Sequence, residues 1–173
     1  MFINFAVYIF KLDFMTKNLV IIPTYKEKEN IKAIIDAVLS LPRDFHILII
    51  DDNSPDGTAD IVKNLQTTHP QQLHMVQRAG KLGLGTAYIE GFKWAIERKY
   101  DYIFEMDADF SHPPADLINL HDACINKNAD LAIGSRYISG VNVVNWPMGR
   151  VLMSYFASVY VRMITGMKIM DTT

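Results

Sequence analysis

The 173-residue sequence has one cysteine, no apolar run long enough to cross a membrane, and no large excess of charge of either sign. The single cysteine, Cys124, excludes a disulfide framework or a Cys-x-x-Cys metal site within the chain, and we interpret it as a small core residue. Seventeen basic and nineteen acidic residues leave a formal charge of −2 without a basic cluster, which argues against nucleic acid as a partner. A reducing, cytoplasmic compartment fits this composition.

The apolar start of the chain, MFINFAVYIFKLDFM, fails the tests for a membrane anchor and for a secretory signal. Its uncharged part ends at Phe10, half of the roughly 20 residues that a spanning helix needs, and no positive charge precedes it. We therefore expect residues 1–14 to be an extension outside the fold. Half of all residues are hydrophobic, which is enough for residues 15–173 to form one domain with a sizeable core.

Short apolar runs alternate with longer helical patterns, which is typical of βαβ units and a mostly parallel sheet. The runs LVII and ILII are continuously apolar, as expected when helices cover both faces of the sheet. We predict five strands, over residues 19–22, 47–50, 74–77, 102–106 and 130–134. We predict helices between them, over residues 29–39, 58–66, 86–98 and 114–126. The expected fold class is α/β.

Residues 151–161, VLMSYFASVYV, are apolar almost all round and are bounded by Arg150 and Arg162. The run is too short to span a bilayer. Two interpretations stay open: a core helix buried against a partner, or a helix at a membrane interface with the arginines at headgroup level.

Polar residues follow four of the predicted strands at the point where each strand ends. Ligands of open α/β sheets bind beyond the carboxyl ends of the strands, so these residues are expected to form one binding rim. The four segments are residues 23–27 (PTYKE), 51–58 (DDNSPDGT), 107–109 (DAD) and 134–137 (GSRY).

Asp107 and Asp109 are one residue apart at the end of an apolar strand, so in extended geometry both carboxylates point to the same side. Hard oxygen ligands suit Mg²⁺ or Mn²⁺, with water and phosphate oxygens completing the shell. A solvated turn would explain an isolated Asp-x-Asp, but the position after a buried strand favours a metal site that serves a diphosphate leaving group. His112 is close by, in either a structural or a metal-adjacent role.

The rim also contains Asp51 and Asp52, and clustered carboxylates require hydrogen-bond donors such as ribose hydroxyls or base N–H groups. Asp56 is better explained by a Pro-Asp-Gly turn before a helix. Arg136 is interpreted as the only arginine at a strand end of this rim. Its planar fork suits a diphosphate, and the alternative is an ion pair with a rim carboxylate.

The segment KLGLGTA, residues 81–87, contains glycines before a helix but matches neither GxxxxGK[ST] nor GxGxxG. We interpret the glycines as permitting a tight turn and close helix packing, with Lys81 or the loop amides available to an anion.

With these residues in place, the chain resembles family 2 inverting glycosyltransferases of the GT-A fold, and among them the polyprenol-phosphate (dolichol-phosphate) mannosyltransferases. The resemblance covers residues 19 to 173 through five ordered motifs, IIPTYKEKENI, IIDDNSPDGTADIV, KLGLGTAYIEGF, MDADFSHPP and GSRY. It implies a catalytic set of Asp107, Asp109 and Arg136, with the two aspartates as metal ligands. It also implies a donor-binding set of Pro23, Tyr25, Glu27, Ile50, Asp52, Asp107, Ala108, Asp109, Ser111 and Arg136.

The implied reaction is metal-dependent transfer of mannose from GDP-mannose to a polyprenol phosphate with inversion, by a protein peripheral to the cytoplasmic face of a membrane. Two departures from the family pattern stand out: Lys26 occupies a position that is commonly Asn, and the sequence ends before the family's Gly-Gly-Phe stretch, as expected of a catalytic domain truncated at its C-terminus. Residues 146–170 would then face the lipid acceptor. Alternatives are a transferase using a UDP-sugar, a non-catalytic nucleotide-sugar-binding module and, more distantly, a phosphoryl-transfer enzyme with Asp107 as nucleophile.

Overall fold

The computed structural model describes residues 16–127, 129–135, 147–167 and 169–171. The chain divides into two compact units, residues 1–118 and residues 119–173.

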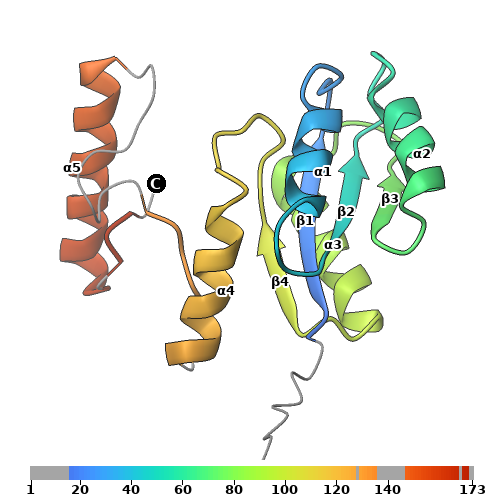
Figure 1. Cartoon of the computed structure of the whole chain (residues 1–173). Coiled ribbons are helices and arrows are strands. Elements are labelled where there is room, and N and C mark those ends of the chain that lie inside the picture. Colours follow the sequence, from blue (N-terminus) through green and yellow to red (C-terminus); the bar gives the residue numbers. More distant parts are fainter. Residues whose placement is uncertain (1–15, 128, 136–146, 168, 172–173) are drawn as a thin grey trace, which may run out of the picture. The chain divides into compact units, whose positions relative to one another are not determined.

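The first unit is built on a parallel sheet with the strand order β3-β2-β1-β4 (Figure 1). The strands are β1 (Asn18–Thr24), β2 (Phe45–Asp51), β3 (Leu73–Gln77) and β4 (Tyr102–Glu105). The first four predicted strands are therefore confirmed, with β1 and β2 extended at both ends.

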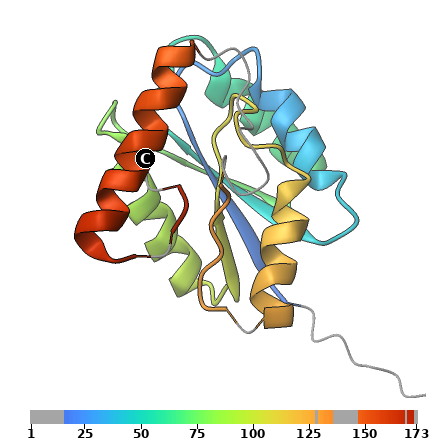
Figure 2. The same ribbon diagram turned by 90° about the vertical axis from the view of Figure 1, so that its left-hand side faces the viewer.

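Helices cover both faces of this sheet, as its continuously apolar strands predict. Helices α1 (Ile31–Leu39) and α2 (Thr58–Thr68) pack on one face and on each other, and α3 (Leu84–Glu97) covers the opposite face (Figures 1 and 2). Successive residues of β1 point to opposite faces, and Leu19 and Ile21 join the fully buried cluster that faces α3. Each such side chain stabilises the fold by about 1.5–3 kcal/mol.

Helix α3 approaches the sheet closely because Gly91 has no side chain. A Cβ atom at this position would lie 2.7 Å from Cγ2 of Ile21. Gly91 lies outside the segment 81–87 whose glycines were predicted to allow a tight turn and close packing. Within that segment a Cβ at Gly83 or Gly85 would meet nothing within 4 Å, so the predicted close packing is wrong there and only the predicted turn is confirmed. Gly83, which precedes the helix, has a φ of +99° and supplies the turn.

The second unit contains most of α4 (Asp116–Lys127) and all of α5 (Met148–Thr165). The predicted fifth strand is wrong: residues 130–134 have irregular backbone, with Leu131 73% and Ile133 48% exposed. An apolar run becomes a strand only where a neighbour accepts its backbone hydrogen bonds, and no strand of the described chain pairs with this one.

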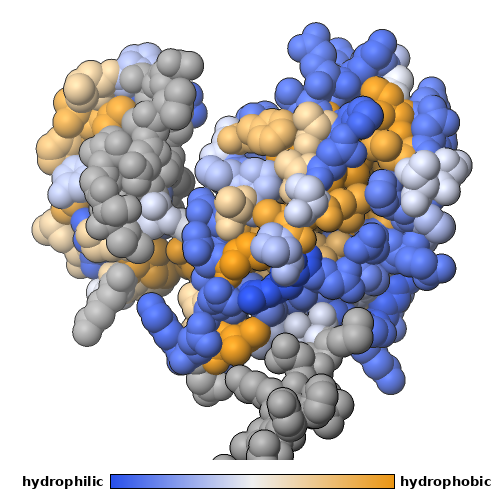
Figure 3. Space-filling model, in the orientation of Figure 1, coloured by the Kyte–Doolittle hydropathy of each residue, from blue (hydrophilic) through white to orange (hydrophobic). Residues whose placement is uncertain are grey.

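Helix α5 is longer than the apolar run that predicted it and includes both flanking arginines, Arg150 and Arg162. Apolar side chains dominate its exposed surface (Figure 3), among them Met153, Phe156 and Met163 at 73%, 63% and 79% exposure. No helix in the described part of the chain is long and apolar enough to cross a membrane.

Candidate functional site

The loops that follow β1, β2 and β4 lie at the carboxyl edge of the sheet, because the strands are parallel. The structure thus brings three of the four predicted rim segments to one edge. The fourth follows no strand, and Arg136, its predicted functional residue, lies outside the described residues.

The loop after β1, which carries Tyr25 and Glu27, is held by side chains from the loop after β2. Backbone N–H groups of Lys26 and Glu27 donate to Ser54 Oγ at 3.0 Å and to Thr58 Oγ1 at 3.1 Å. The two loops therefore form one hydrogen-bonded unit. Tyr25 and Glu27 are both half-buried in it.

Asp56 has the structural role that its turn predicts. Its Oδ1 accepts from the N–H and the hydroxyl of Thr58, at 3.1 and 2.6 Å, and its Oδ2 accepts from the Lys28 N–H at 3.2 Å. The Thr58 hydroxyl is the main reason why the pKa of the Asp56 carboxyl lies below its ordinary value.

Asp51 is fully buried, and its carboxylate is satisfied by the protein itself. It accepts from Thr24 Oγ1 at 3.0 Å and from the N–H and hydroxyl of Ser54 at 3.0 and 2.6 Å. The hydrogen-bond donors that this carboxylate requires are therefore the hydroxyl groups of Thr24 and Ser54 and the amide of Ser54. Asp51 thus stabilises the rim from the protein interior.

Asp52 is bound by an arginine that comes directly after β3. Arg78 is 7% exposed, its Nε donates to Asp52 Oδ1 at 2.5 Å, and its Nη2 lies 2.5 Å from the same oxygen. The interpretation of Arg136 as the only arginine at a strand end of this rim is therefore wrong. The position of Arg78 immediately after the third predicted strand was a signal that could have revealed it.

Asp107 and Asp109 lie in a turn, not in extended backbone. Strand β4 ends at Glu105, although the Met106 N–H still donates to the Ile21 carbonyl at 3.2 Å. Ala108 and Asp109 form the turn, and Phe110 follows with a φ of +61°. The premise that strand alternation aligns the two carboxylates is wrong, because the chain leaves the sheet before it reaches them.

Asp107 has two neighbouring polar groups, one on α3 and one in its own loop. The hydroxyl of Tyr88, on α3, donates to Asp107 Oδ1 at 3.4 Å, and burial, reinforced by the carboxylates of Asp107 and Glu105, raises the pKa of this phenol. The phenol therefore stays protonated as a donor. The Asp107 backbone N–H donates to His112 Nδ1 at 3.3 Å, which gives His112 a structural contact and requires an unprotonated Nδ1.

The two aspartates suit a hard divalent cation. The backbone N–H of Ser111 donates to Asp109 Oδ1 at 2.9 Å and is the main cause of the lowered pKa of this carboxyl, which keeps it ionised. The Asp107 side chain is 43% exposed, so its oxygens are open to an ion. Among the described residues no group of three His, Cys, Asp or Glu is placed to hold a metal. A cation here would take its other ligands from water and from a bound diphosphate.

The other residues predicted to bind the donor differ in their solvent exposure. Pro23 pairs with Ile50 in the register of β1 and β2, and it is half-buried, whereas Ile50 is 0% exposed and belongs to the core that faces α3. Ala108 is also buried, and Ser111 is exposed. Ile50 and Ala108 thus support the rim from below, while Pro23 and Ser111 are open to a ligand.

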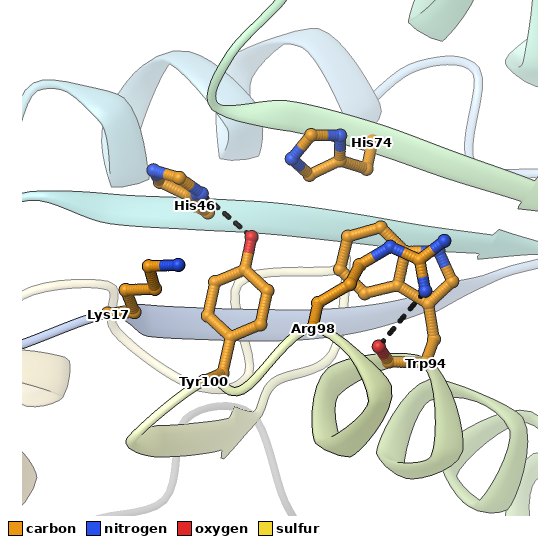
Figure 4. A pocket seen from close by; sticks show the side chains of 6 residues that line it. All are labelled: Lys17, His46, His74, Trp94, Arg98 and Tyr100. Atoms are coloured by element: carbon orange, nitrogen blue, oxygen red, sulfur yellow. Dashed lines mark hydrogen bonds between the residues drawn. The ribbon is translucent and has the colours of Figure 1, made fainter.

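A cavity of about 480 Å³ lies at the opposite, amino-terminal edge of the same unit (Figure 4). Its wall is an aromatic cluster in which the Tyr100 hydroxyl lies 2.8 Å from His46 Nδ1 and Arg98 stacks 4.0 Å from the Trp94 ring. Burial is the main cause of the lowered pKa of His74 there. None of the predicted site residues lines this cavity, whose lining is Lys17, His46, His74, Trp94, Arg98 and Tyr100.

Comparison with known protein families identifies the family of the chain. Residues 19–170 match the family described as Glycosyl transferase family 2, a stretch that contains all but the first residue of β1, strands β2 to β4, the Asp107–Asp109 segment and α5. The chain belongs to glycosyl transferase family 2. The predicted family is confirmed, and so is the predicted α/β fold class, with four parallel strands and helices on both faces of the sheet.

Two curated relatives are similar over most of this chain. A polyprenol monophosphomannose synthase from Mycolicibacterium smegmatis is 46% identical over 91% of the chain and 59% of its own length. An undecaprenyl-phosphate mannosyltransferase from Micrococcus luteus is 42% identical over 90% of the chain and 63% of its own length. The chain thus spans about three fifths of the length of these relatives.

Among solved structures, the chain is similar to the mannosyltransferase PcManGT from Pyrobaculum calidifontis in complex with GDP-Man and Mn²⁺. The TM-score is 0.43 at 29% identity, and the match covers 48% of this chain and 25% of that one.

Proposed function

We propose that this chain is the donor-binding part of a hexosyltransferase that transfers mannose from GDP-mannose to a polyprenol phosphate with inversion. The observation that carries the proposal is the pair of surface-accessible carboxylates of Asp107 and Asp109 after β4, in a chain that is 46% identical to a polyprenol monophosphomannose synthase. The proposed catalytic domain comprises residues 15–173.

Asp107 and Asp109 are the proposed ligands of Mg²⁺ or Mn²⁺, together with oxygens of the donor diphosphate. The ion would neutralise charge that develops on the departing nucleoside diphosphate. The protein orients this pair through Tyr88, His112 and the Ser111 amide. Preorganised ligands of this kind need no rearrangement as the bond to the sugar breaks.

The remaining proposed donor contacts are Pro23 near the end of β1, Tyr25 and Glu27 in the loop after it, and Arg136. Pro23, Tyr25 and Glu27 are each partly exposed at the rim. Arg136 is proposed to hold the donor phosphates, because a guanidinium fork matches two phosphate oxygens.

A polyprenol phosphate needs little activation by the protein. Its phosphate carries close to two negative charges near neutral pH and is already a nucleophile, so a dedicated general base is not required. The work of the protein is to position both substrates and stabilise charge on the leaving group. The exposed apolar surface of α5, with Arg150 and Arg162, is proposed to meet the lipid acceptor at the cytoplasmic face of a membrane.

Donor binding and transfer test the proposal separately. With Mn²⁺ present, GDP-mannose is expected to raise the unfolding temperature more than UDP-glucose does; the reverse order would favour the UDP-sugar alternative.

Mannose transfer to a short polyprenol phosphate is then measured for this chain and for a version extended to the length of the relatives. Binding without transfer in either protein would favour the non-catalytic module.

The metal ligands are tested by single substitutions. Asp107→Asn and Asp109→Asn are each expected to abolish the Mn²⁺-dependent part of GDP binding and to lower turnover by about 100-fold or more, because each removes a charged oxygen ligand. Asp60→Asn, an exposed position on α2, is the matched control. Two variants with wild-type affinity and turnover would refute the metal assignment.

A further inference from the structure

The loop that joins β3 to α3, residues 78–83, is tied to the rim by a buried arginine. Besides its ion pair with Asp52, the Arg78 guanidinium donates from Nη1 to Thr86 Oγ1 at 2.7 Å and from Nη2 to the Gly83 carbonyl at 3.2 Å. The second Asp52 oxygen accepts from the Leu82 N–H at 3.3 Å. One guanidinium thus connects the end of β2, the loop and the first turn of α3.

The loop has little hydrophobic anchoring of its own. Leu82 is 61% exposed, Leu84 at the start of α3 is 58% exposed, and Gly80 and Gly83 add backbone freedom. A segment of this composition adopts one conformation only if polar contacts impose it. The Arg78 and Asp52 contacts to Leu82 and Gly83 are therefore what sets the path of the chain through Lys81.

That path places the Lys81 ammonium at the predicted nucleotide pocket. Its Nζ lies 4.7 Å from the ring centroid of Tyr25. Tyr25 belongs to the loop after β1, so this cation–π contact links that loop to the loop after β3. A cation at this position offsets the negative charge of an incoming nucleoside diphosphate.

A purely stabilising role accounts poorly for this arrangement. Burying an ion pair costs desolvation that its attraction roughly offsets, so a buried pair such as Arg78–Asp52 adds little to stability compared with apolar residues of the same volume. What the pair does supply is geometry, because Nη2 of Arg78 and the second oxygen of Asp52 both bind backbone groups of this loop.

We propose that Arg78 is a positioning residue which, through the loop of residues 78–83, holds Lys81 beside Tyr25 as a further contact for the diphosphate of the nucleotide donor. This inference rests on the proposed function, since it concerns the same donor. It adds Arg78 and Lys81 to the residues that define the pocket.

Equilibrium binding of GDP with Mn²⁺ tests the inference. Lys81→Gln is expected to raise the Kd about tenfold, the effect of losing one charge-assisted contact, and to weaken the dependence of the Kd on salt. Lys93→Gln, an exposed lysine on α3, is the matched control and should leave the Kd unchanged. In the transferase assay, Lys81→Gln should raise KM for the donor more than it lowers kcat.

Arg78 is tested through its coupling to Lys81. Arg78→Lys keeps the charge but loses the forked hydrogen bonds of the guanidinium. Thr86→Val removes one hydrogen-bond acceptor of Arg78 and leaves no buried charge unpaired. The second variant therefore serves as a safeguard if the first does not fold. Each is expected to raise the Kd by several-fold, and in either background Lys81→Gln should add little, because the contact is already lost.

The outcomes separate this inference from the proposed function. GDP binding that depends on Asp109 but is unaffected by Lys81→Gln overturns the inference alone. Effects of Thr86→Val and Lys81→Gln that multiply in the double variant overturn the coupling through Arg78. No Asp109-dependent binding of GDP or UDP at all would overturn the proposed function and this inference together.

Discussion

Single residues in unusual backbone conformations mark the carboxyl edge of the sheet. Lys26, Asn53 and Phe110 have positive φ angles of 63°, 56° and 61°, and they follow β1, β2 and β4 respectively. Such angles cost non-glycine residues of the order of 1 kcal/mol and persist only where surrounding contacts impose them. Three of the four such residues in the described chain therefore lie in the loops that carry the predicted donor and metal residues, and the fourth, Lys99, lies between α3 and β4.

Lys26 illustrates why a departure from the family pattern has a physical consequence. The resemblance indicates Asn at this position, and Asn tolerates a positive φ better than Lys does. We predict that Lys26→Asn raises the free energy of unfolding by about 0.5–1 kcal/mol. Urea denaturation provides the measurement, with the exposed neighbour Lys28→Asn as control; equal changes in both variants would contradict the prediction.

The buried carboxylate of Asp51 is predicted to stabilise the fold. Asp51→Ala removes the acceptor for Thr24 and Ser54 and leaves buried donors unpaired, so we expect it to lower the free energy of unfolding by about 2–3 kcal/mol. Asp60→Ala on the surface of α2 should cost no more than about 0.5 kcal/mol. Denaturant titrations of the two variants decide the point, and comparable losses would argue against a bracing role for Asp51.

At the scale of secondary-structure elements, hydrophobic patterning predicts what packs locally and fails where an element needs a distant partner. The runs LVII and ILII predict β1 and β2 because both faces of these strands are covered by helices. Residues 130–134 look equally strand-like, yet they have no neighbour to pair with in the described structure. Element boundaries shift for a related reason: β4 ends at Glu105 because its ladder with β1 ends at the Ile21 pairing.

The residues of the candidate site also divide into those that the sequence predicts and those whose role depends on tertiary packing. The positions of Asp107, Asp109 and Asp56 in loops after strands were readable from the sequence. Tyr88 was not, because its contact with Asp107 depends on how α3 crosses the sheet. Arg78 stood at a predicted strand end and was readable, but its burial and its pairing with Asp52 follow from the three-dimensional course of the loop.

Two glycines of α3 provide a matched test of how this helix is held. Gly91→Ala would place a Cβ 2.7 Å from Cγ2 of Ile21, so we expect a loss of about 1–3 kcal/mol in the free energy of unfolding. At Gly85 an added Cβ meets nothing within 4 Å, and Ala should there increase stability by about 0.5–1 kcal/mol through helix propensity. Thermal or urea unfolding should give opposite signs for the two variants; a stabilising Gly91→Ala would show that the packing of α3 on β1 is looser than described.

For the whole molecule, the described structure separates two kinds of surface. The polar rim with its carboxylates and Arg78 is contained in the first unit, whereas the exposed apolar residues of α5 belong to the second. Donor chemistry needs fixed charges and hydrogen bonds, and a lipid acceptor needs apolar contact area with nearby cations. If each unit serves one substrate, changes in α5 should affect the acceptor and spare the donor.

This separation of the two surfaces yields a prediction for transfer to different acceptors. A triple variant, Met153→Gln, Phe156→Ser and Met163→Gln, replaces three largely exposed apolar side chains of α5 without changing charge. We expect an unchanged Kd for GDP with Mn²⁺, and transfer to a long polyprenol phosphate in vesicles reduced by about tenfold, because the variant loses roughly 1–2 kcal/mol of apolar contact with the lipid phase. Transfer to a short, water-soluble prenol phosphate should fall much less. Equal losses with both acceptors would mean that α5 shapes the reaction centre itself, and a weakened Kd for GDP would mean that the two surfaces are not separable.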